Sequence, residues 1–276
     1  MTTTPNPTST TAPEADAYQR AADRLARAAR EHTPCSPIRD LLGATDLAAG
    51  YAIQRRLTHA AVESGRRIVG AKIGLTSRSV QRQLGVDRPD FGVLFADMQR
   101  PQHEPIDLTE LLQPRIEAEI AFILNTDLAR PDLDIDTVRA GVGQVVPALE
   151  IVDSRITSWD ISLVDTIADN ASSGLYVLGD ELRPLAGLNL PQLAMSMTAG
   201  ADLVSEGTGA DCLGDPCEAL LWLARTAHEF GAPLRAGDLV LSGALGPMVP
   251  VQPGTTYTAS VEGLGTARAS FGKESQ

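Results

Sequence analysis

Residues 114–124 combine strong β-strand propensity with two acidic side chains, and this combination restricts how the chain can fold. They read Pro-Arg-Ile-Glu-Ala-Glu-Ile-Ala-Phe-Ile-Leu, so Glu117 and Glu119 are separated by a single residue. Side chains alternate between the two faces of a strand, so both carboxylates lie on one face and the neighbouring apolar side chains on the other. Two carboxylates side by side on a largely buried strand repel each other and lose hydration, so the arrangement requires a cation.

A third carboxylate, Glu150, ends a similar apolar run at residues 145–150. Three carboxylates that arrive from strand-like segments indicate a hard divalent metal held by oxygen ligands. Ligation by carboxylates alone favours Mg²⁺ or Mn²⁺ over zinc and leaves coordination positions for water and a chelating substrate. The alternative is that Glu117 and Glu119 form the solvated face of a strand. The apolar residues beside them favour the metal site.

The charge balance disfavours several classes of partner. The 276 residues include 35 acidic and 23 basic side chains, and the formal net charge of −12 argues against nucleic acid and anionic membranes as partners. Since no run of about 18 apolar residues occurs, we expect no transmembrane helix. Residues 1–14 are rich in threonine and proline and lack the features of a secretory signal, so we expect a disordered tail there.

The cysteines and histidines argue against zinc and disulfides. Cys35, Cys212 and Cys217 are odd in number and have no C-x-x-C spacing, which predicts a reducing, cytoplasmic location. The four histidines are scattered, so a histidine-rich metal site is not expected. The chain also lacks G-x-x-x-x-G-K-[ST], G-x-S-x-G and a G-x-G-x-x-G after a strand, which argues against ATP-dependent, serine-hydrolase and dinucleotide-binding functions.

Helical patterns dominate the first part of the chain and strand patterns dominate the rest. We expect helices at residues 15–30, 45–64, 77–85, 134–140 and 216–230. We expect strands at residues 67–75, 117–124, 145–152, 175–178, 238–242, 255–262 and 266–271. Regular alternation of strand and helix is missing, so the expected class is α+β. A helical N-terminal portion with one strand (residues 15–85) is expected to pack with a metal-binding catalytic core (residues 86–276) as one compact unit.

Three further polar positions are candidates for the same site. Lys72 lies within Val-Gly-Ala-Lys-Ile-Gly-Leu, and a lysine in an apolar strand is either half of a structural ion pair or a catalytic acid–base group. Asp90 is either a turn-forming residue or a loop carboxylate in the pocket. Ser172 and Ser173 either cap a turn or donate hydrogen bonds to a substrate carboxylate.

Several long motifs carry a resemblance to a known family over about residues 48–271. They are Tyr51-Ala-Ile-Gln, Lys72-Ile-Gly-Leu-Thr, Leu84-Gly-Val-Asp-Arg-Pro-Asp-Phe-Gly, Gln113-Pro-Arg-Ile-Glu-Ala-Glu-Ile, Pro147-Ala-Leu-Glu, Val164-Asp-Thr-Ile-Ala-Asp-Asn-Ala-Ser and Ser242-Gly-Ala-Leu-Gly-Pro-Met. With these motifs the chain resembles the 2-keto-4-pentenoate hydratase family, within the fumarylacetoacetate hydrolase superfamily. The threonine- and proline-rich tail has no counterpart in the resemblance.

The resemblance implies a role for each candidate residue. The family's metal ligands fall on Glu117, Glu119 and Glu150, its pocket lysine and aspartate on Lys72 and Asp90, and its substrate contacts on Ser172 and Leu75. It also implies a compact, mostly β catalytic core of fumarylacetoacetate-hydrolase type with an N-terminal helical portion, bound Mg²⁺ or Mn²⁺, and assembly into homo-oligomers. Other enzymes of the same pathway are further possible partners.

The reaction that the resemblance implies is hydration of 2-hydroxypenta-2,4-dienoate to 4-hydroxy-2-oxopentanoate, in meta-cleavage degradation of aromatic compounds. A first alternative is a 4-oxalocrotonate-type decarboxylase of the same family, whose substrate carries a second carboxylate and needs a basic partner such as Arg78, Arg82 or Arg155. A second alternative is a non-catalytic partner subunit. Such a subunit has no chemical need for a buried lysine beside three carboxylates.

Overall fold

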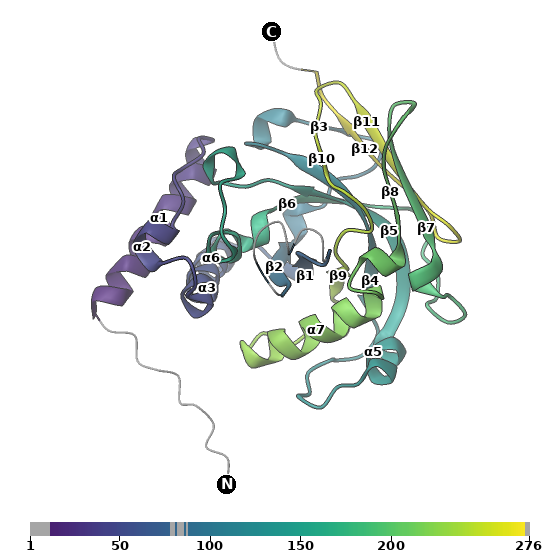
Figure 1. Ribbon diagram of the computed structural model, residues 1–276, viewed down its shortest axis with the longest axis horizontal. Coiled ribbons are helices and arrows are strands. Elements are labelled where there is room, and N and C mark those ends of the chain that lie inside the picture. The colour runs from purple at the N-terminus through teal and green to yellow at the C-terminus, as the bar shows by residue number, and fades with distance from the viewer. Residues whose placement is uncertain (1–11, 78–80, 82–85, 87, 274–276) are drawn as a thin grey trace.

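The structure is a computed structural model and describes residues 12–77, 81, 86 and 88–273. Two β-sheets and a group of helices make up the described part of the chain (Figure 1). The class is α+β, as the sequence predicts. None of the described helices is both long and apolar enough to span a bilayer.

The larger sheet carries the predicted acidic strand at its centre. Its strand order is β2-β1-β9-β4-β5-β6, with β10 paired to one end of β4. The bounds are β1 Ile68–Gly74, β2 Asp90–Phe95, β4 Arg115–Leu124, β5 Val142–Val152, β6 Ser173–Leu178, β9 Leu239–Leu241 and β10 Val249–Pro250. The short strand β9 lies between β1 and β4, so a strand from the N-terminal portion is part of the core sheet.

The larger sheet curls until its first and last strands approach each other. Gln99, just after β2, forms a bridge with Tyr176 of β6, and the Arg100 N–H donates a hydrogen bond of 2.9 Å to the Tyr176 carbonyl. One apolar cluster therefore joins the inner faces of strands from both edges and from the centre. It includes Leu94, Ala121, Val146, Ala148, Tyr176 and Leu241. These residues fill the inside of the curl.

The smaller sheet covers part of the outer face of the curl. Its order is β3-β12-β11-β7-β8, and it lies at the upper right of Figure 1. The bounds are β3 Pro105–Ile106, β7 Ala194–Ala199, β8 Asp202–Thr208, β11 Thr256–Val261 and β12 Gly265–Phe271. Its buried side chains, such as Met197 and Tyr257, share one apolar core with Ile116, Ala118 and Ile120 of β4. The predicted alternation along β4 is confirmed, because these residues face outward and leave the two glutamates inside.

The helices lie on two sides of the larger sheet. Helices α1, α2, α3 and α6 gather at the left of Figure 1, whereas α7 runs along the lower side and α5 lies at the lower right. The bounds are α1 Ala12–Glu31, α2 Arg39–Leu42, α3 Leu47–Glu63, α5 Ile135–Gly141, α6 Leu163–Ala168 and α7 Pro216–Glu229. Helix α7 begins as predicted, with Asp215 as N-cap accepting a hydrogen bond from the Cys217 N–H.

Some element bounds differ from the sequence-based expectation. Helix α1 begins at Ala12, so residues 12–14 are helical and do not belong to a disordered tail. The rest of the expected tail, residues 1–11, lies outside the described residues, as does most of the helix expected at residues 77–85. Helix α6 is not among the expected elements, because six residues give too little periodicity, although its capping box of Ser162 and Asp165 is a local signal.

Asp165 joins the N-terminal helices to the site-bearing part of the fold. This fully buried carboxylate accepts hydrogen bonds from the Ile38 N–H (2.8 Å), the Arg39 N–H (2.9 Å) and the Arg39 guanidinium (2.7 Å). The Ser162 N–H and hydroxyl also donate to this carboxylate, at the oxygen Oδ2. Burial raises the pKa of Asp165, but these hydrogen bonds outweigh burial and hold the pKa below its ordinary value.

We expect Asp165→Asn to lower the free energy of unfolding at pH 7 by about 2–4 kcal/mol, because the variant breaks a buried charge-assisted network. Since the folded-state pKa is lowered, the stabilisation is present above the unfolded-state pKa of about 3.9 and is lost as the pH falls through the folded-state value. Urea unfolding from pH 7 downward measures the difference.

The matched control is Asp160→Asn, because Asp160 pairs with the same Arg39 at 2.7 Å but is exposed. We expect this variant to cost less than about 1 kcal/mol. Equal losses in the two variants would contradict the role given to Asp165.

Candidate active site

Three glutamates meet on the inner face of the curl. Glu117 of β4 lies directly opposite Glu150 of β5 in the strand register, and Glu119 is two residues further along β4. One carboxylate oxygen from each lies within 4.8 Å of those of the other two. Glu119 and Glu150 are fully buried and Glu117 is half-buried. The structure thus brings the three predicted ligands together.

The buried oxygens of this cluster lack hydrogen-bond donors. Glu119 Oε2 accepts a hydrogen bond of 2.7 Å from the Gly243 N–H. Among the described residues, Glu119 Oε1 and Glu150 Oε2 have no hydrogen-bond partner, and Glu150 Oε1 is ion-paired with Lys72. Burial and the Glu150 charge raise the pKa of Glu117 to about 7 and that of Glu119 well above its ordinary value. Unsatisfied buried carboxylate oxygens are costly. An all-oxygen set of this kind fits a divalent metal ion.

Lys72 places a positive charge beside the glutamates. On β1, Lys72 pairs with Leu241 of β9, and Leu241 pairs with Ala121 of β4. Paired residues share a face of the sheet, and Ala121 shares its face with Glu119, so the lysine side chain points into the curl. The Nζ atom lies 3.3 Å from Glu150 Oε1, and 2% of the side chain is exposed. Burial lowers the pKa of Lys72, but Glu150 and the other carboxylates outweigh burial and hold the pKa above its ordinary value. The lysine is therefore a buried ammonium paired with Glu150.

Asp90 begins β2 and lies opposite Gly74 of β1. It is almost fully buried, and burial raises its pKa although the charge of Lys72 opposes the shift. Asp90 Oδ2 accepts a hydrogen bond of 3.3 Å from the Thr166 hydroxyl, whereas Oδ1 has no hydrogen-bond partner among the residues that the structure describes. A Cβ atom at Gly74 would lie 2.2 Å from Asp90 Oδ1 and 3.4 Å from Lys72 Nζ. The glycine of Lys-Ile-Gly-Leu therefore makes room for both side chains.

The two predicted substrate contacts share an unusual backbone conformation. Leu75 has φ +58° and Ser172 has φ +52°, values that residues other than glycine rarely adopt. Leu75 follows β1, and its carbonyl accepts a hydrogen bond of 2.7 Å from the Gln81 side chain. The Ser172 hydroxyl lies 3.3 Å from that of Thr166. Strained residues of this kind cluster at functional sites.

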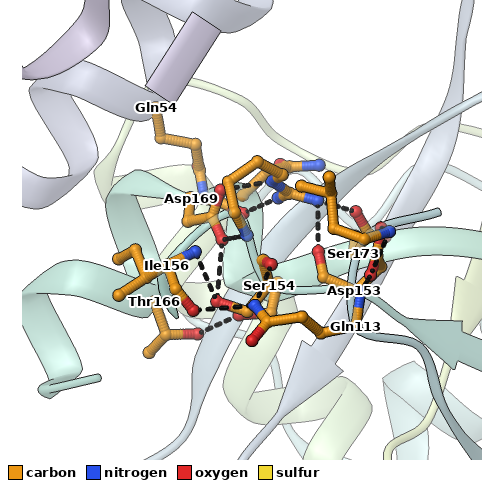
Figure 2. A network of polar contacts seen from close by, with 12 residues as sticks. Gln54, Gln113, Asp153, Ser154, Ile156, Thr166, Asp169 and Ser173 are labelled. Carbon is orange, nitrogen blue, oxygen red and sulfur yellow. Dashed lines mark hydrogen bonds and ion pairs between the residues drawn. The ribbon is translucent and has the colours of Figure 1, made fainter. Parts of the chain in front are cut away.

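A network of polar contacts that includes Asp153, Asp169 and Ser173 lies beside the site (Figure 2). Arg155 forms an ion pair with Asp169 and donates hydrogen bonds to the carbonyls of Asp153 (2.6 Å) and Ser173 (2.8 Å). Burial raises the pKa of Asp169 to about 6, against the opposing charge of Arg155. Arg155 is thus committed to structural contacts and not to binding a second substrate carboxylate. The other two arginine candidates, Arg78 and Arg82, lie outside the described residues.

Sequence reasoning marked the motifs that contain the residues holding the site together but gave these residues no individual roles. Gly243 supplies the N–H to Glu119, and its φ of +97° together with a close approach to Thr76 excludes a side chain. Thr166 contacts both Asp90 and Ser172, and Gln54 joins strand β2 to helix α6. Two features of the sequence could have indicated these roles: the glycine directly after Ser242, and Gln54 as a single glutamine among the apolar residues of α3.

Comparison with known proteins places this fold and site in a family. A family model described as Fumarylacetoacetate (FAA) hydrolase C-terminal matches residues 58–271. The chain belongs to the fumarylacetoacetate hydrolase family. Within that family it groups with the 2-keto-4-pentenoate hydratases. It is 49% identical to a 2-keto-4-pentenoate hydratase of Paraburkholderia xenovorans, over 92% of this chain and 94% of the relative.

Two further similarities extend over almost the whole chain. A protein of Pseudomonas putida F1 named TodF product hydratase is 52% identical, over 93% of this chain and 96% of the relative. The solved structure of 4-oxalocrotonate decarboxylase from Pseudomonas putida G7, complexed with magnesium and adipate, superposes with a TM-score of 0.89 at 29% identity. That alignment covers 95% of this chain and all of the decarboxylase.

Gly243→Ala is expected to weaken Mn²⁺ binding about 10-fold and to destabilise the protein by about 1–3 kcal/mol. The added Cβ would lie 2.4 Å from two side-chain atoms of Thr76, so the loop must shift and the N–H that holds Glu119 shifts with it. Calorimetric titration with Mn²⁺ and thermal melting measure the two effects.

Gly263→Ala is the control, since Gly263 also has positive φ (+73°) but has no atom within 4 Å of an added Cβ. This variant is destabilised only by the positive φ that alanine must adopt, so its Mn²⁺ affinity is expected to equal that of the wild type. A Gly243→Ala protein that binds Mn²⁺ as the wild type does would show that this N–H is not needed.

Proposed function

We propose that the chain is a metal-dependent hydratase that adds water to 2-hydroxypenta-2,4-dienoate and forms 4-hydroxy-2-oxopentanoate. The observation that carries the proposal is the cluster of three carboxylates beside the Lys72 ammonium, in which Glu119 Oε1 and Glu150 Oε2 have no hydrogen-bond partner within the described part of the chain. The named hydratases at 49% and 52% identity, matched over nearly their full length, support the substrate class.

Glu117, Glu119 and Glu150 are the proposed metal ligands, and the proposed ion is Mg²⁺ or Mn²⁺. When bound, the ion supplies Lewis-acid stabilisation of negative charge on a substrate oxygen. The Gly243 N–H fixes one oxygen of Glu119 and leaves the other available as a ligand. Mg²⁺ bound to the decarboxylase with TM-score 0.89 supports the choice of a hard divalent ion.

The reaction requires four proton movements, and the site offers two buried groups for them. Ketonisation removes the proton of the C2 hydroxyl and adds one at C5; hydration then adds hydroxide at C4 and a proton at C3. Lys72 and Asp90 are the proposed carriers, because both lie inside the curl beside the glutamates. An ammonium can give a proton, and a carboxyl group whose pKa is raised can exchange one.

Ser172 and Leu75 are the proposed substrate contacts. The Ser172 hydroxyl offers a hydrogen bond next to Asp90, through Thr166, and Leu75 offers an apolar side chain immediately after the strand of Lys72. Both residues have a positive φ. Leu75 directly follows the strand that carries Lys72, and Ser172 ends the turn that follows the helix of Thr166. Assembly into homo-oligomers and a cytoplasmic location stay predictions.

The runner-up is decarboxylation of a 2-oxo diacid, which the superposition on 4-oxalocrotonate decarboxylase favours. A second carboxylate needs a basic partner in the pocket. Of the three candidate arginines the structure describes Arg155 alone, and Asp169 and two carbonyls occupy its guanidinium. The named hydratases at 49% and 52% identity rank hydration first.

One assay separates hydratase, decarboxylase and non-catalytic subunit. Metal-loaded protein is incubated with 2-hydroxypenta-2,4-dienoate and, separately, with 2-oxo-3-hexenedioate, while dienol absorbance and CO₂ release are followed. We expect loss of the dienol with 4-hydroxy-2-oxopentanoate as product and no CO₂. Release of CO₂ from the diacid as the faster reaction would replace hydration with decarboxylation, and inactivity on both would favour the subunit.

Two substitutions are expected to separate metal binding from proton transfer. Glu119→Gln removes a proposed ligand, so Mn²⁺ affinity falls at least about 10-fold. Without metal the same variant melts at a higher temperature than the wild type, because a buried like charge is gone. Lys72→Met retains Mn²⁺ affinity, since it removes a competing cation, but lowers kcat by about 10²–10⁴-fold.

Calorimetry, melting curves and steady-state rates measure these effects. Glu206→Gln, on the exposed face of β8, is the control and is expected to match the wild type in all three. Undiminished Mn²⁺ affinity in Glu119→Gln would remove the metal assignment, whereas near wild-type kcat in Lys72→Met would remove only the lysine's role.

A further inference from the structure

The Thr166 hydroxyl lies within hydrogen-bonding distance of two proposed site residues, Asp90 and Ser172. It is 3.3 Å from Asp90 Oδ2 and 3.3 Å from the Ser172 hydroxyl oxygen. All three side chains are at least 95% buried. They come from three elements: strand β2, helix α6 and the turn Asn170–Ser172. The line of oxygens therefore depends on how β2 packs against the other two.

The number of hydroxyl hydrogens fixes the direction of the chain of bonds. A threonine hydroxyl has one hydrogen, and an ionised carboxylate accepts hydrogen bonds without donating any. When Thr166 donates to ionised Asp90, Ser172 must donate to Thr166. The Ser172 oxygen then has lone pairs left for the substrate but no hydrogen. When Asp90 carries a proton on Oδ2, every bond reverses and Ser172 can donate to the substrate.

Two amide side chains keep these elements at a fixed separation. Gln54 of α3 donates to the carbonyl of Phe91, next to Asp90 (2.8 Å), and to the carbonyl of Ile167, next to Thr166 (3.0 Å). Asn170 accepts from the Val93 N–H (2.7 Å) and donates to the Val93 carbonyl (2.9 Å). Strand β2 is thereby clamped to both the helix that carries Thr166 and the turn that carries Ser172.

We propose that Thr166 is a positioning and relay residue that connects Asp90 to the substrate through Ser172. The proposal rests on the proposed function, since it assigns a path for one of its protons. A substrate O–H proton passes to the Ser172 oxygen, the Ser172 proton passes to Thr166, and the Thr166 proton passes to Asp90 Oδ2. Three O–H bonds break and three form, so the substrate oxygen loses one proton and Asp90 gains one.

The relay changes what Ser172 does for the substrate. Donation to a substrate carboxylate is the role that serines in this position suggest from sequence, and it requires a hydrogen that Ser172 lacks while Asp90 is ionised. In the ionised state Ser172 accepts from a substrate hydroxyl or a water molecule instead. The specificity of this end of the site is thus for a group that can donate a hydrogen bond.

Thr166→Val and Thr166→Ser test the relay, because valine keeps the shape without the hydroxyl and serine keeps the hydroxyl. In metal-loaded enzyme acting on 2-hydroxypenta-2,4-dienoate, we expect Thr166→Val to lower kcat at least about 10-fold with KM within about threefold of wild type. Thr166→Ser is expected to restore kcat to within about threefold. Should the valine variant fail to fold, Thr166→Ala takes its place against Thr166→Ser.

A binding measurement separates failure of the relay from failure of the proposed function. The probe is 2-hydroxypentanoate, which keeps a C2 hydroxyl that can donate a hydrogen bond and lacks the double bonds of the substrate, titrated calorimetrically into Mn²⁺-loaded protein. We expect about threefold weaker binding in Thr166→Val than in Thr166→Ser, because Ser172 loses its orienting partner. If the wild type is inactive on the dienoate but the variants still differ in binding as expected, the proposed substrate is wrong and the positioning role of Thr166 is retained. Valine and serine variants that match each other in kcat and in affinity would overturn the role of Thr166.

Discussion

The electrostatic cost of burying three carboxylates inside one curled sheet governs this structure. Glu119 and Glu150 are fully removed from water, and, as far as the described residues go, Glu119 Oε1 and Glu150 Oε2 have no hydrogen-bond donor. Burial raises the pKa of each of the three glutamates, and the single ammonium of Lys72 cannot neutralise three charges. The divalent cation proposed for the cluster supplies the missing positive charge.

The surrounding elements can be understood as the means of holding these charges in place. The register of β4 and β5 sets Glu117 against Glu150. The inserted strand β9 pairs with the strand of Lys72 and leads directly to the Gly243 N–H that binds Glu119. Helices α3 and α6 close the open side through Gln54 and present Thr166 to Asp90. The proposed metal ligands, proton carriers and substrate contacts therefore come from separate elements that pack around one sheet.

The candidate residues could be predicted from the sequence because strand alternation and residue chemistry are local. The two-residue period of a strand predicts that Glu117 and Glu119 lie on one face, and a lysine in an apolar strand predicts an oppositely charged partner. Their neighbours could not be predicted, because Leu241 lies far along the chain from Lys72 and no local pattern sets that pairing. The left-handed backbone at Ser172 and the six-residue helix of Thr166 depend on tertiary packing rather than on propensity.

The most direct test of the account is a crystal structure of the protein grown with Mn²⁺, with anomalous scattering recorded near the manganese absorption edge. The account predicts one strong anomalous peak within about 2.0–2.4 Å of oxygens from Glu117, Glu119 and Glu150, with the partnerless Oε1 of Glu119 among the ligands. A strong peak elsewhere in the fold, or none at saturating Mn²⁺ with Lys72 still paired to Glu150, would contradict it.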